Sequence, residues 1–265
     1  MLGRRSQGSR DAGDARRHAL SVDDVGDPAG TSVVYQHGGG DSRLSRHPDD
    51  SIAAELGIRL LAVDRCGPAA RHRSLRAWAE EVVPALSEQF AVVGWSAGGP
   101  HALAVAAVAP ERVTRVALVG SMPPHDAVRL VARDVQQAMR AARMSPRVAA
   151  RALERWGRQP TPPTGSTETD DAYARGRLES FRAGGLWLAR ELAYLGRPWG
   201  FDLRDVRAPV TLWWGESDAV CPPEIGREYE RRLPDATLRL VEGTHQLLFS
   251  RWREILADAA QRTRP

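Results

Sequence analysis

The chain has 265 residues, of which 42% are hydrophobic and 26% charged, so it can build a sizeable core in one large domain or in one domain with an insertion. All 37 basic side chains are arginines, and the formal net charge is +4 at pH 7. The arginines are interleaved with Asp and Glu instead of forming a basic stripe, so a nucleic-acid partner is not expected. No apolar run approaches the roughly 18 residues of a membrane span, so a membrane partner is not expected either.

Residues 1–19 are rich in Arg, Gly, Asp and Ser without apolar periodicity, and they predict a disordered tail. This tail has no apolar segment after its arginines, so it does not resemble a secretory signal. The two cysteines, Cys66 and Cys221, lack metal-ligand spacing and are expected to be reduced thiols of a cytoplasmic protein. No metal or organic cofactor is predicted.

Short apolar runs rich in β-branched residues alternate with amphipathic stretches from about residue 20 onward. This alternation predicts an α/β fold, with a mostly parallel, doubly wound sheet of about eight strands and helices on both faces. The carboxyl ends of such strands share one edge, where a site is expected. Strands are expected at 20–25, 32–36, 58–64, 90–94, 113–120, 210–214 and 237–241, and helices at 50–56, 74–86, 97–108, 223–232 and 247–261.

Residues 123–199 break this alternation, because they are helical in pattern, rich in arginine and without a convincing strand. They predict a helical lid inserted between two strands, which leaves 20–122 and 200–265 as the core. The inserted segment contains Trp156, Trp187 and Trp199, which are candidates for an apolar pocket roof with a basic rim. In the alternative interpretation, these tryptophans pack in the core beneath solvated arginines.

A candidate nucleophile lies between an apolar strand and an alanine-rich helix, where residues 94–98 read Gly-Trp-Ser-Ala-Gly. In a nucleophile elbow, glycines two positions before and after the serine permit a sharp strand-to-helix turn that exposes the hydroxyl. The helix amino end beneath it favours developing negative charge. Ser96 is therefore the candidate nucleophile, and the alternative is a small-residue turn with an incidental serine.

A serine hydroxyl needs a base, and the base needs a group that orients it. Of the seven histidines, only His245 follows a late strand at the predicted active edge. Asp218 follows the preceding strand and is the preferred acid, which gives the chain order Ser, Asp, His. Glu216 is a nearby competitor, and Asp126 is the second choice because it follows the strand before that.

Three consecutive glycines after the strand at 32–36 form a candidate oxyanion loop, in which residues 37–40 read His-Gly-Gly-Gly. Glycines leave backbone N–H groups free to face an oxyanion, and the second donor is the N–H after the nucleophile. Gly39 and Ala97 are the predicted donors, with Gly40 as a further candidate. The alternative is a flexible glycine turn.

These motifs together resemble the α/β-hydrolase fold superfamily, in its single-domain form with a helical lid, over about residues 21–260. The resemblance implies Ser96 as nucleophile, Asp218 as acid, His245 as base, Gly39 and Ala97 as oxyanion donors, and His37 as a structural residue of the site wall. A serine at the elbow, where dehalogenases and epoxide hydrolases have aspartate, argues against those two classes. The resemblance rests on residues 37–39, 64–67, 94–99, 214–218 and 243–245.

One loop departs from the family pattern, since residues 64–70 read Asp-Arg-Cys-Gly-Pro-Ala-Ala where the family commonly has Asp-Arg-Pro-Gly-x-Gly. The loop lines the entrance in relatives, so the pocket is expected to be reshaped, with Cys66 either facing substrate or buried and inert. The candidates for the pocket wall are His37, Gly38, Gly40, Trp95, Cys66, Trp156 and Trp187.

The predicted activity is hydrolysis of an ester, thioester or lactone of a small organic substrate through an acyl-enzyme, by a monomer or homodimer. The first alternative is a tailoring enzyme of secondary metabolism that uses the same triad for elimination, cyclisation or C–C cleavage. An aminopeptidase would need acidic lid residues, for which Glu179 and Glu191 are present. A catalytically silent ligand-binding protein on the same scaffold is the alternative from another class.

Overall fold

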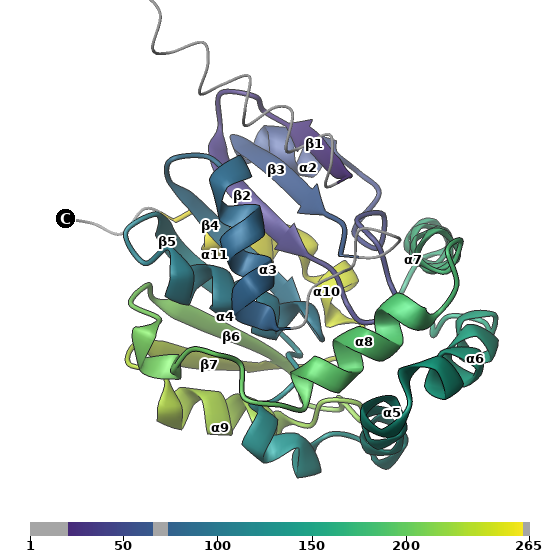
Figure 1. The fold of residues 1–265 in the computed structure, drawn as a ribbon. Helices are drawn as coiled ribbons and strands as arrows, with labels where there is room; N and C mark the ends of the chain where they lie inside the picture. Colours follow the sequence, from purple (N-terminus) through teal and green to yellow (C-terminus); the bar gives the residue numbers. More distant parts are fainter. Residues whose placement is uncertain (1–20, 66–73, 262–265) are drawn as a thin grey trace, which may run out of the picture.

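The computed structural model describes residues 21–65 and 74–261, so the expected tail at 1–19 and Cys66 lie outside the described residues. One seven-stranded sheet in the order β1-β3-β2-β4-β5-β6-β7 forms the centre of the molecule (Figure 1). Strand β1 pairs with β3 in antiparallel fashion, and the other neighbours pair in parallel. The strands are β1 Val22–Gly26, β2 Thr31–Gln36, β3 Ile58–Val63, β4 Phe90–Trp95, β5 Val113–Val119, β6 Val210–Gly215 and β7 Ala236–Val241.

The sequence predicted about eight strands, and the described residues form seven. Each of the seven corresponds to one of the expected apolar runs, with ends that differ by a residue or two. The remaining described segments are helices and turns, so an eighth strand has no counterpart among them. The mostly parallel, doubly wound α/β architecture is confirmed.

Both faces of the sheet are covered, which explains why its central strands are almost continuously apolar. All residues of β4 and β6 are buried. Successive side chains of a strand point to opposite faces, so Val92 packs in one hydrophobic cluster and Val93 in the other. The first cluster includes residues of α3 (Leu75–Val82), α4 (Gly98–Val108) and α9 (Pro223–Arg232), and the second includes residues of α2 (Ser51–Glu55), α10 (Leu247–Ser250) and α11 (Trp252–Ala259).

Two of the expected core helices are shorter than predicted. The helix expected at 74–86 ends at Val82, and the chain continues as a 3₁₀ turn, η1 (Val83–Ala85), which contains Pro84. The helix expected at 247–261 is divided into α10 and α11 at Arg251, whose φ of −112° and ψ of 17° are not helical. A further 3₁₀ turn, η3 (Leu203–Asp205), precedes β6.

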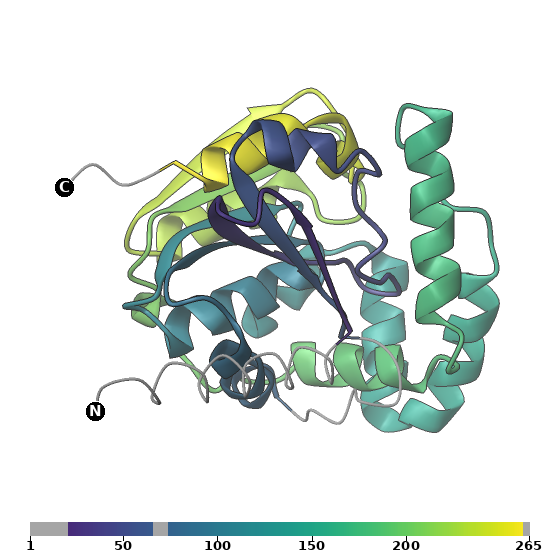
Figure 2. The same cartoon turned by 90° about the horizontal axis from the view of Figure 1, so that it is seen from above.

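The segment expected as a lid is helical and lies between β5 and β6 in the chain. Figures 1 and 2 show its helices grouped together beside the sheet, beyond the carboxyl ends of the central strands. The described residues of this segment contain no strand. Among all the described helices, none combines the length and the apolar character that a membrane span needs. Its elements are η2 (His125–Leu130), α5 (Arg133–Met144), α6 (Pro146–Gly157), α7 (Thr167–Ser180) and α8 (Leu186–Leu195). Movement of these helices as a lid stays a prediction.

Candidate active site

Ser96 lies at the turn between β4 and α4, where its φ of +53° is in the left-handed region that non-glycine residues rarely occupy. Its backbone N–H donates to Val119 O at 3.0 Å, which ties the turn to the neighbouring strand β5. A side chain at Gly98 would collide with Gln36 O, so glycine there lets helix α4 pack closely against the end of β2. These are the geometric features of a nucleophile elbow.

Ser96, His245 and Asp218 form a hydrogen-bonded row. His245 Nε2 lies 3.0 Å from Ser96 Oγ, and His245 Nδ1 lies 2.8 Å from Asp218 Oδ2. The other carboxylate oxygen of Asp218 accepts hydrogen bonds from the backbone N–H groups of Val220 and Cys221. Because Asp218 accepts at Nδ1, the proton of the neutral imidazole resides there and Nε2 is left to accept from the serine.

Two further contacts fix the position of the imidazole. Trp95 Nε1 donates to His245 O at 3.0 Å, and the Trp95 and His245 rings lie 5.7 Å apart. Gly120 has a φ of +47°, and an added Cβ there would lie 2.9 Å from Asp218 Oδ2 and 3.2 Å from His245 Nδ1. Sequence reasoning missed Gly120, although a glycine immediately after β5, at the predicted active edge, was the available signal.

The other acid candidates lie elsewhere. Asp126 is exposed in η2, and its carboxylate accepts a hydrogen bond from Arg232 Nη1 at 2.8 Å. Glu216 is exposed immediately after β6. Of the three carboxylates considered, Asp218 is the one that hydrogen-bonds His245.

The glycine loop after β2 lies beside the elbow. An added Cβ on Gly39 would be 3.2 Å from Ala97 Cβ, so the two predicted donor residues are neighbours. Among the described residues, the backbone N–H groups of Gly39 and Ala97 have no hydrogen-bond acceptor. Two neighbouring N–H groups in this arrangement beside the candidate nucleophile have the geometry of an oxyanion hole.

His37 is fully buried and joins this loop to the end of β3. Its Nε2 accepts from the Arg65 N–H at 3.1 Å, so its Nδ1 carries the proton and donates to Gly38 O at 2.8 Å. Burial penalises the charged ring and holds the pKa of His37 well below its ordinary value. A neutral histidine with both nitrogens engaged fits a structural residue in the site wall.

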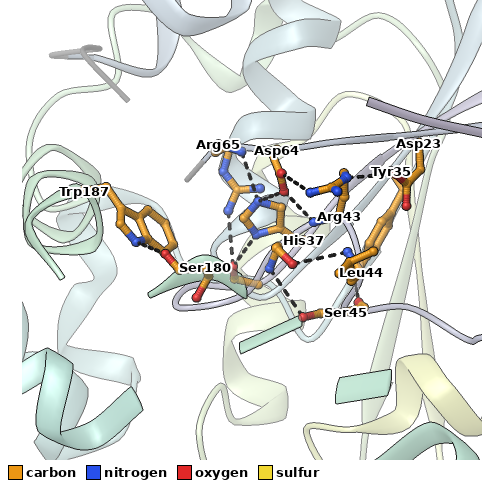
Figure 3. A network of polar contacts seen from close by, with 12 residues as sticks. Asp23, Tyr35, His37, Arg43, Leu44, Ser45, Asp64, Arg65, Ser180 and Trp187 are labelled. Carbon is orange, nitrogen blue, oxygen red and sulfur yellow. Dashed lines mark hydrogen bonds and ion pairs between the residues drawn. The ribbon is translucent and has the colours of Figure 1, made fainter. Parts of the chain in front are cut away.

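The residues after the glycine loop are fixed by the polar network in Figure 3. Arg43 donates to Asp23 Oδ1 at 2.8 Å and to Asp64 Oδ2 at 2.7 Å, which joins the loop to β1 and to the end of β3. Tyr35 Oη donates to Ser45 O at 2.6 Å. Figure 3 places these contacts on one side of His37, with Ser180 and Trp187 on the other.

The tryptophans of the inserted helices have different surroundings. Trp187 is buried, with its Nε1 donating to Ser180 O and its ring centroid 6.4 Å from that of His37. Trp156 is 36% exposed, and its ring lies against Gly40. Trp199 is buried against Phe201. Trp156 and Trp187 therefore lie next to the glycine loop and its histidine, while the packing of Trp199 is that of a core residue.

Among the described residues, neither the cysteine nor the acidic groups form a metal site. Cys221 is a free, buried thiol, and burial raises its pKa well above the ordinary value. In the part of the chain that the structure describes, no three His, Cys, Asp or Glu side chains form a group that could hold a metal ion.

Comparisons with known proteins bear on the family of the chain. A model of the alpha/beta hydrolase fold family matches residues 31–251. A pimeloyl-[acyl-carrier protein] methyl ester esterase of Aromatoleum aromaticum is 34% identical over 188 residues, which are 65% of this chain and 72% of the relative. A protein of the same name from Chromobacterium violaceum is 31% identical over 227 residues, 79% of this chain and 84% of the relative. The solved structure of an esterase from Rhodococcus sp. ECU1013 has a TM-score of 0.62 at 24% identity, covering 90% of this chain and 94% of that chain.

The chain therefore belongs to the α/β-hydrolase fold family, as its resemblance to that family predicted. Within the family, its similarity to two esterases makes it a hydrolase of the carboxylic ester type. The fold and the enzyme class predicted from the sequence are confirmed.

Proposed function

We propose that the protein hydrolyses an ester of a small organic substrate through Ser96, His245 and Asp218. The observation that carries the proposal is the continuous row of hydrogen bonds from Ser96 Oγ through His245 to Asp218. His245 Nε2 takes the hydroxyl proton as Ser96 Oγ bonds to the carbonyl carbon, and Asp218 stabilises the imidazolium that forms. His245 then protonates the departing alkoxide, and the acyl group remains on Ser96.

The second half-reaction uses the same groups in reverse. Water loses a proton to His245 as its oxygen attacks the acyl carbon, and the acid leaves when the proton returns to Ser96. In both halves the carbonyl oxygen becomes negative, and the N–H groups of Gly39 and Ala97 stabilise it. Each such donor contributes about a hundred- to a thousandfold in rate in enzymes of this kind.

A fluorophosphonate probe tests the nucleophile. The wild-type protein is expected to gain one covalent adduct in its intact mass and to hydrolyse esters, and Ser96→Ala is expected to do neither. Ser217→Ala is the matched control, because this exposed serine lies on the Asp218 loop and its loss should change nothing. A folded Ser96→Ala protein that still hydrolyses esters would contradict the mechanism.

The solvent oxygen separates hydrolysis from elimination, cyclisation or C–C cleavage by the same triad. In water enriched in ¹⁸O, hydrolysis places one labelled oxygen in the acid product. A product without the label would favour elimination or cyclisation. Tight ligand binding without any serine adduct would instead favour a silent binding protein.

Aminopeptidase activity receives little support from the acidic residues of the inserted helices. Glu191 is buried and already pairs with Arg65, with 2.8 Å between Glu191 Oε1 and Arg65 Nε. Glu179, near the end of α7, pairs with Arg182 in the turn that follows this helix. Neither carboxylate is left unpaired to neutralise the α-amino group of a peptide.

A methyl ester linked to an acyl carrier is the more specific substrate class that we propose, after the relatives' printed names. Helices α5 and α6 carry exposed arginines that form no ion pair with another described residue. This positive surface suits a substrate carried by an acidic or phosphorylated partner. The arginines are Arg133, Arg140, Arg143, Arg147, Arg151 and Arg155.

Salt dependence tests this substrate class. For a carrier-linked methyl ester, kcat/KM should fall as salt rises from about 50 to about 300 mM, because salt screens charges beyond about 10 Å. For the free methyl ester it should stay nearly constant. Arg147→Glu should weaken the first reaction alone, and Arg207→Glu, just before β6, is the matched control. Equal kcat/KM for both esters at all salt concentrations would contradict a carrier.

A further inference from the structure

Asp41 is a buried carboxylate immediately after the glycine loop, and the proposed reaction does not use it. Its side chain is 3% exposed. An added Cβ on Gly38 would lie 2.6 Å from Asp41 Oδ2, so the carboxylate packs against the backbone of the oxyanion loop. Among the described residues, Asp41 Oδ1 has no hydrogen-bond partner.

Arg177 on helix α7 faces this carboxylate. Its Nε lies 3.9 Å from Asp41 Oδ1 and, like that oxygen, is buried without a hydrogen-bond partner in the described part of the chain. The guanidinium is held on a Trp156 ring at 4.2 Å and a Tyr173 ring at 5.0 Å, and its Nη2 donates to Tyr173 Oη at 2.8 Å. The two rings and Tyr173 Oη therefore hold the cation in place, with its Nε 3.9 Å from Asp41 Oδ1.

Helix α7 holds the same loop at a second point. Ser180 Oγ donates to Gly40 O at 2.7 Å, and the Trp156 ring under Arg177 lies against Gly40. Gly39, the proposed oxyanion donor, directly precedes these two anchored residues. A small shift of Gly40 or Asp41 would therefore rotate or displace the Gly39 N–H.

We infer that Asp41 and Arg177 are positioning residues, which fix the oxyanion loop against helix α7 and so set the place of the Gly39 N–H. The inference rests on the proposed function. It makes α7 a support that holds the oxyanion loop in place. An α7 that swung away would carry Arg177 with it, which would separate the pair and break the hydrogen bond from Ser180 to Gly40.

The positive charges around Asp41 partly offset the effect of its burial, so that both its ionised and its neutral form occur near neutral pH. Burial raises the pKa of Asp41 to about 7, while the nearby positive charges of Arg177, His245 and Arg65 oppose this rise. An ionised Asp41 also favours the imidazolium that forms at His245 during the reaction. The titratable and charged groups facing Asp41 are Arg177 and Tyr173 of α7, Glu191 of α8, Arg65 after β3, Tyr35 of β2, and His245.

The test compares Asp41→Asn, Arg177→Gln and the double variant in ester hydrolysis. Each single change is expected to lower kcat about 10- to 100-fold, with KM within about threefold of wild type, because donor misplacement affects mainly the transition state. The double variant should lose no more than the worse single variant, since the pair acts as a unit. The affinity of an aryl trifluoromethyl ketone, which forms an oxyanion on the serine, should fall in parallel with kcat/KM.

Two matched variants control for folding and for the loss of charge alone. Arg175→Gln changes an exposed arginine of the same helix, and Glu154→Gln changes a carboxylate that accepts from the Gly185 N–H within the inserted helices. Both should keep wild-type kcat. Ser180→Ala removes the hydrogen bond to Gly40 O and should also lower kcat, by less than the changes at Asp41 and Arg177.

Several results would overturn the inference. These are wild-type kcat in folded Asp41→Asn, losses that multiply in the double variant, or a lowered kcat with unchanged trifluoromethyl ketone affinity. Wild-type and Ser96→Ala proteins are measured in the same assay. No turnover by the wild type would contradict the proposed function itself, whereas wild-type turnover with an unaffected Asp41→Asn would contradict the positioning role alone.

Discussion

In the proposed mechanism, Asp218 determines which nitrogen of His245 accepts the proton of Ser96. An amide in its place keeps the shape but can donate to Nδ1, which leaves the proton on Nε2 and the base in the wrong tautomer. We therefore expect Asp218→Asn to lower kcat by about a thousand- to ten-thousandfold, with a small change in KM. Steady-state kinetics on a simple aryl ester measures this.

The two carboxylates that do not contact His245 provide the matched controls. Asp126→Asn removes a surface pair with Arg232, and Glu216→Gln changes an exposed side chain. Both proteins should keep kcat within about twofold of wild type, because exposed charges contribute little. Loss of activity in Asp126→Asn together with an active Asp218→Asn would reverse the assignment of the acid.

Asp41 should make the stability of the protein depend on pH. Its pKa is raised from 3.8 to about 7 in the folded protein, chiefly by burial. The unfolded chain loses this proton near pH 4, so from there to about pH 7 the folded state binds more protons and its stability falls as pH rises. Asparagine does not titrate. The Tm of Asp41→Asn minus the Tm of wild type should therefore rise by several degrees between about pH 5 and about pH 8. A Tm difference that stays constant over this range would contradict the raised pKa.

The hydrogen-bonded row of Ser96, His245 and Asp218 could be predicted from sequence, because each member follows a strand that ends at one sheet edge. Gly-x-Ser-x-Gly after β4, and Asp218 and His245 after the last two strands, are local patterns in a fixed order. The pairing of Asp41 with Arg177 could not be predicted from sequence, because the two residues lie far apart in the chain and become buried together only in the folded protein. In the sequence, Arg177 is one of many arginines on an inserted segment.

At the scale of elements, the close packing of α4 against β2 shapes the elbow. Gly98→Ala would place a methyl group against Gln36 O, so the helix must shift away from the strand. We expect the free energy of unfolding to fall by about 1–3 kcal/mol or more, and kcat to fall as Ser96 moves from His245. Urea unfolding with parallel kinetics measures both.

Gly196→Ala is the control for that change. Gly196 ends α8 with a φ of −85°, and its new methyl group would meet the flexible end of Met139 at 3.3 Å. Its free energy of unfolding should stay within about 1 kcal/mol of wild type. Equal destabilisation by the two substitutions would mean that a methyl group between α4 and β2 costs no more unfolding free energy than one at the end of α8.

The ends of elements were harder to predict than their existence. The apolar pattern of 247–261 is continuous, yet the chain leaves helical geometry at Arg251, so that two short helices cover the sheet face. Such a break depends on how the segment fits the surface beneath it, which local periodicity does not encode.

At the scale of the whole molecule, one hydrophobic cluster joins the inserted helices to the sheet. Val116 and Leu118 of β5 belong to the same cluster as Leu153 of α6 and Trp187 and Leu192 of α8. A separately folded lid would have a core of its own, whereas here unfolding α8 would expose a face of the common core. The inserted helices and the sheet should therefore unfold together.

Hydrogen exchange measured by mass spectrometry tests this cooperativity. Peptides from α8 should show opening free energies within about 1–2 kcal/mol of peptides from β5, because both report unfolding of the shared core. The exposed turn at 165–168, where α7 begins, should exchange orders of magnitude faster and is the internal reference. If α8 exchanged as fast as that turn, the helices would open independently of the sheet, and the contacts of α7 and α8 with the oxyanion loop would be too transient to hold Gly39 in place.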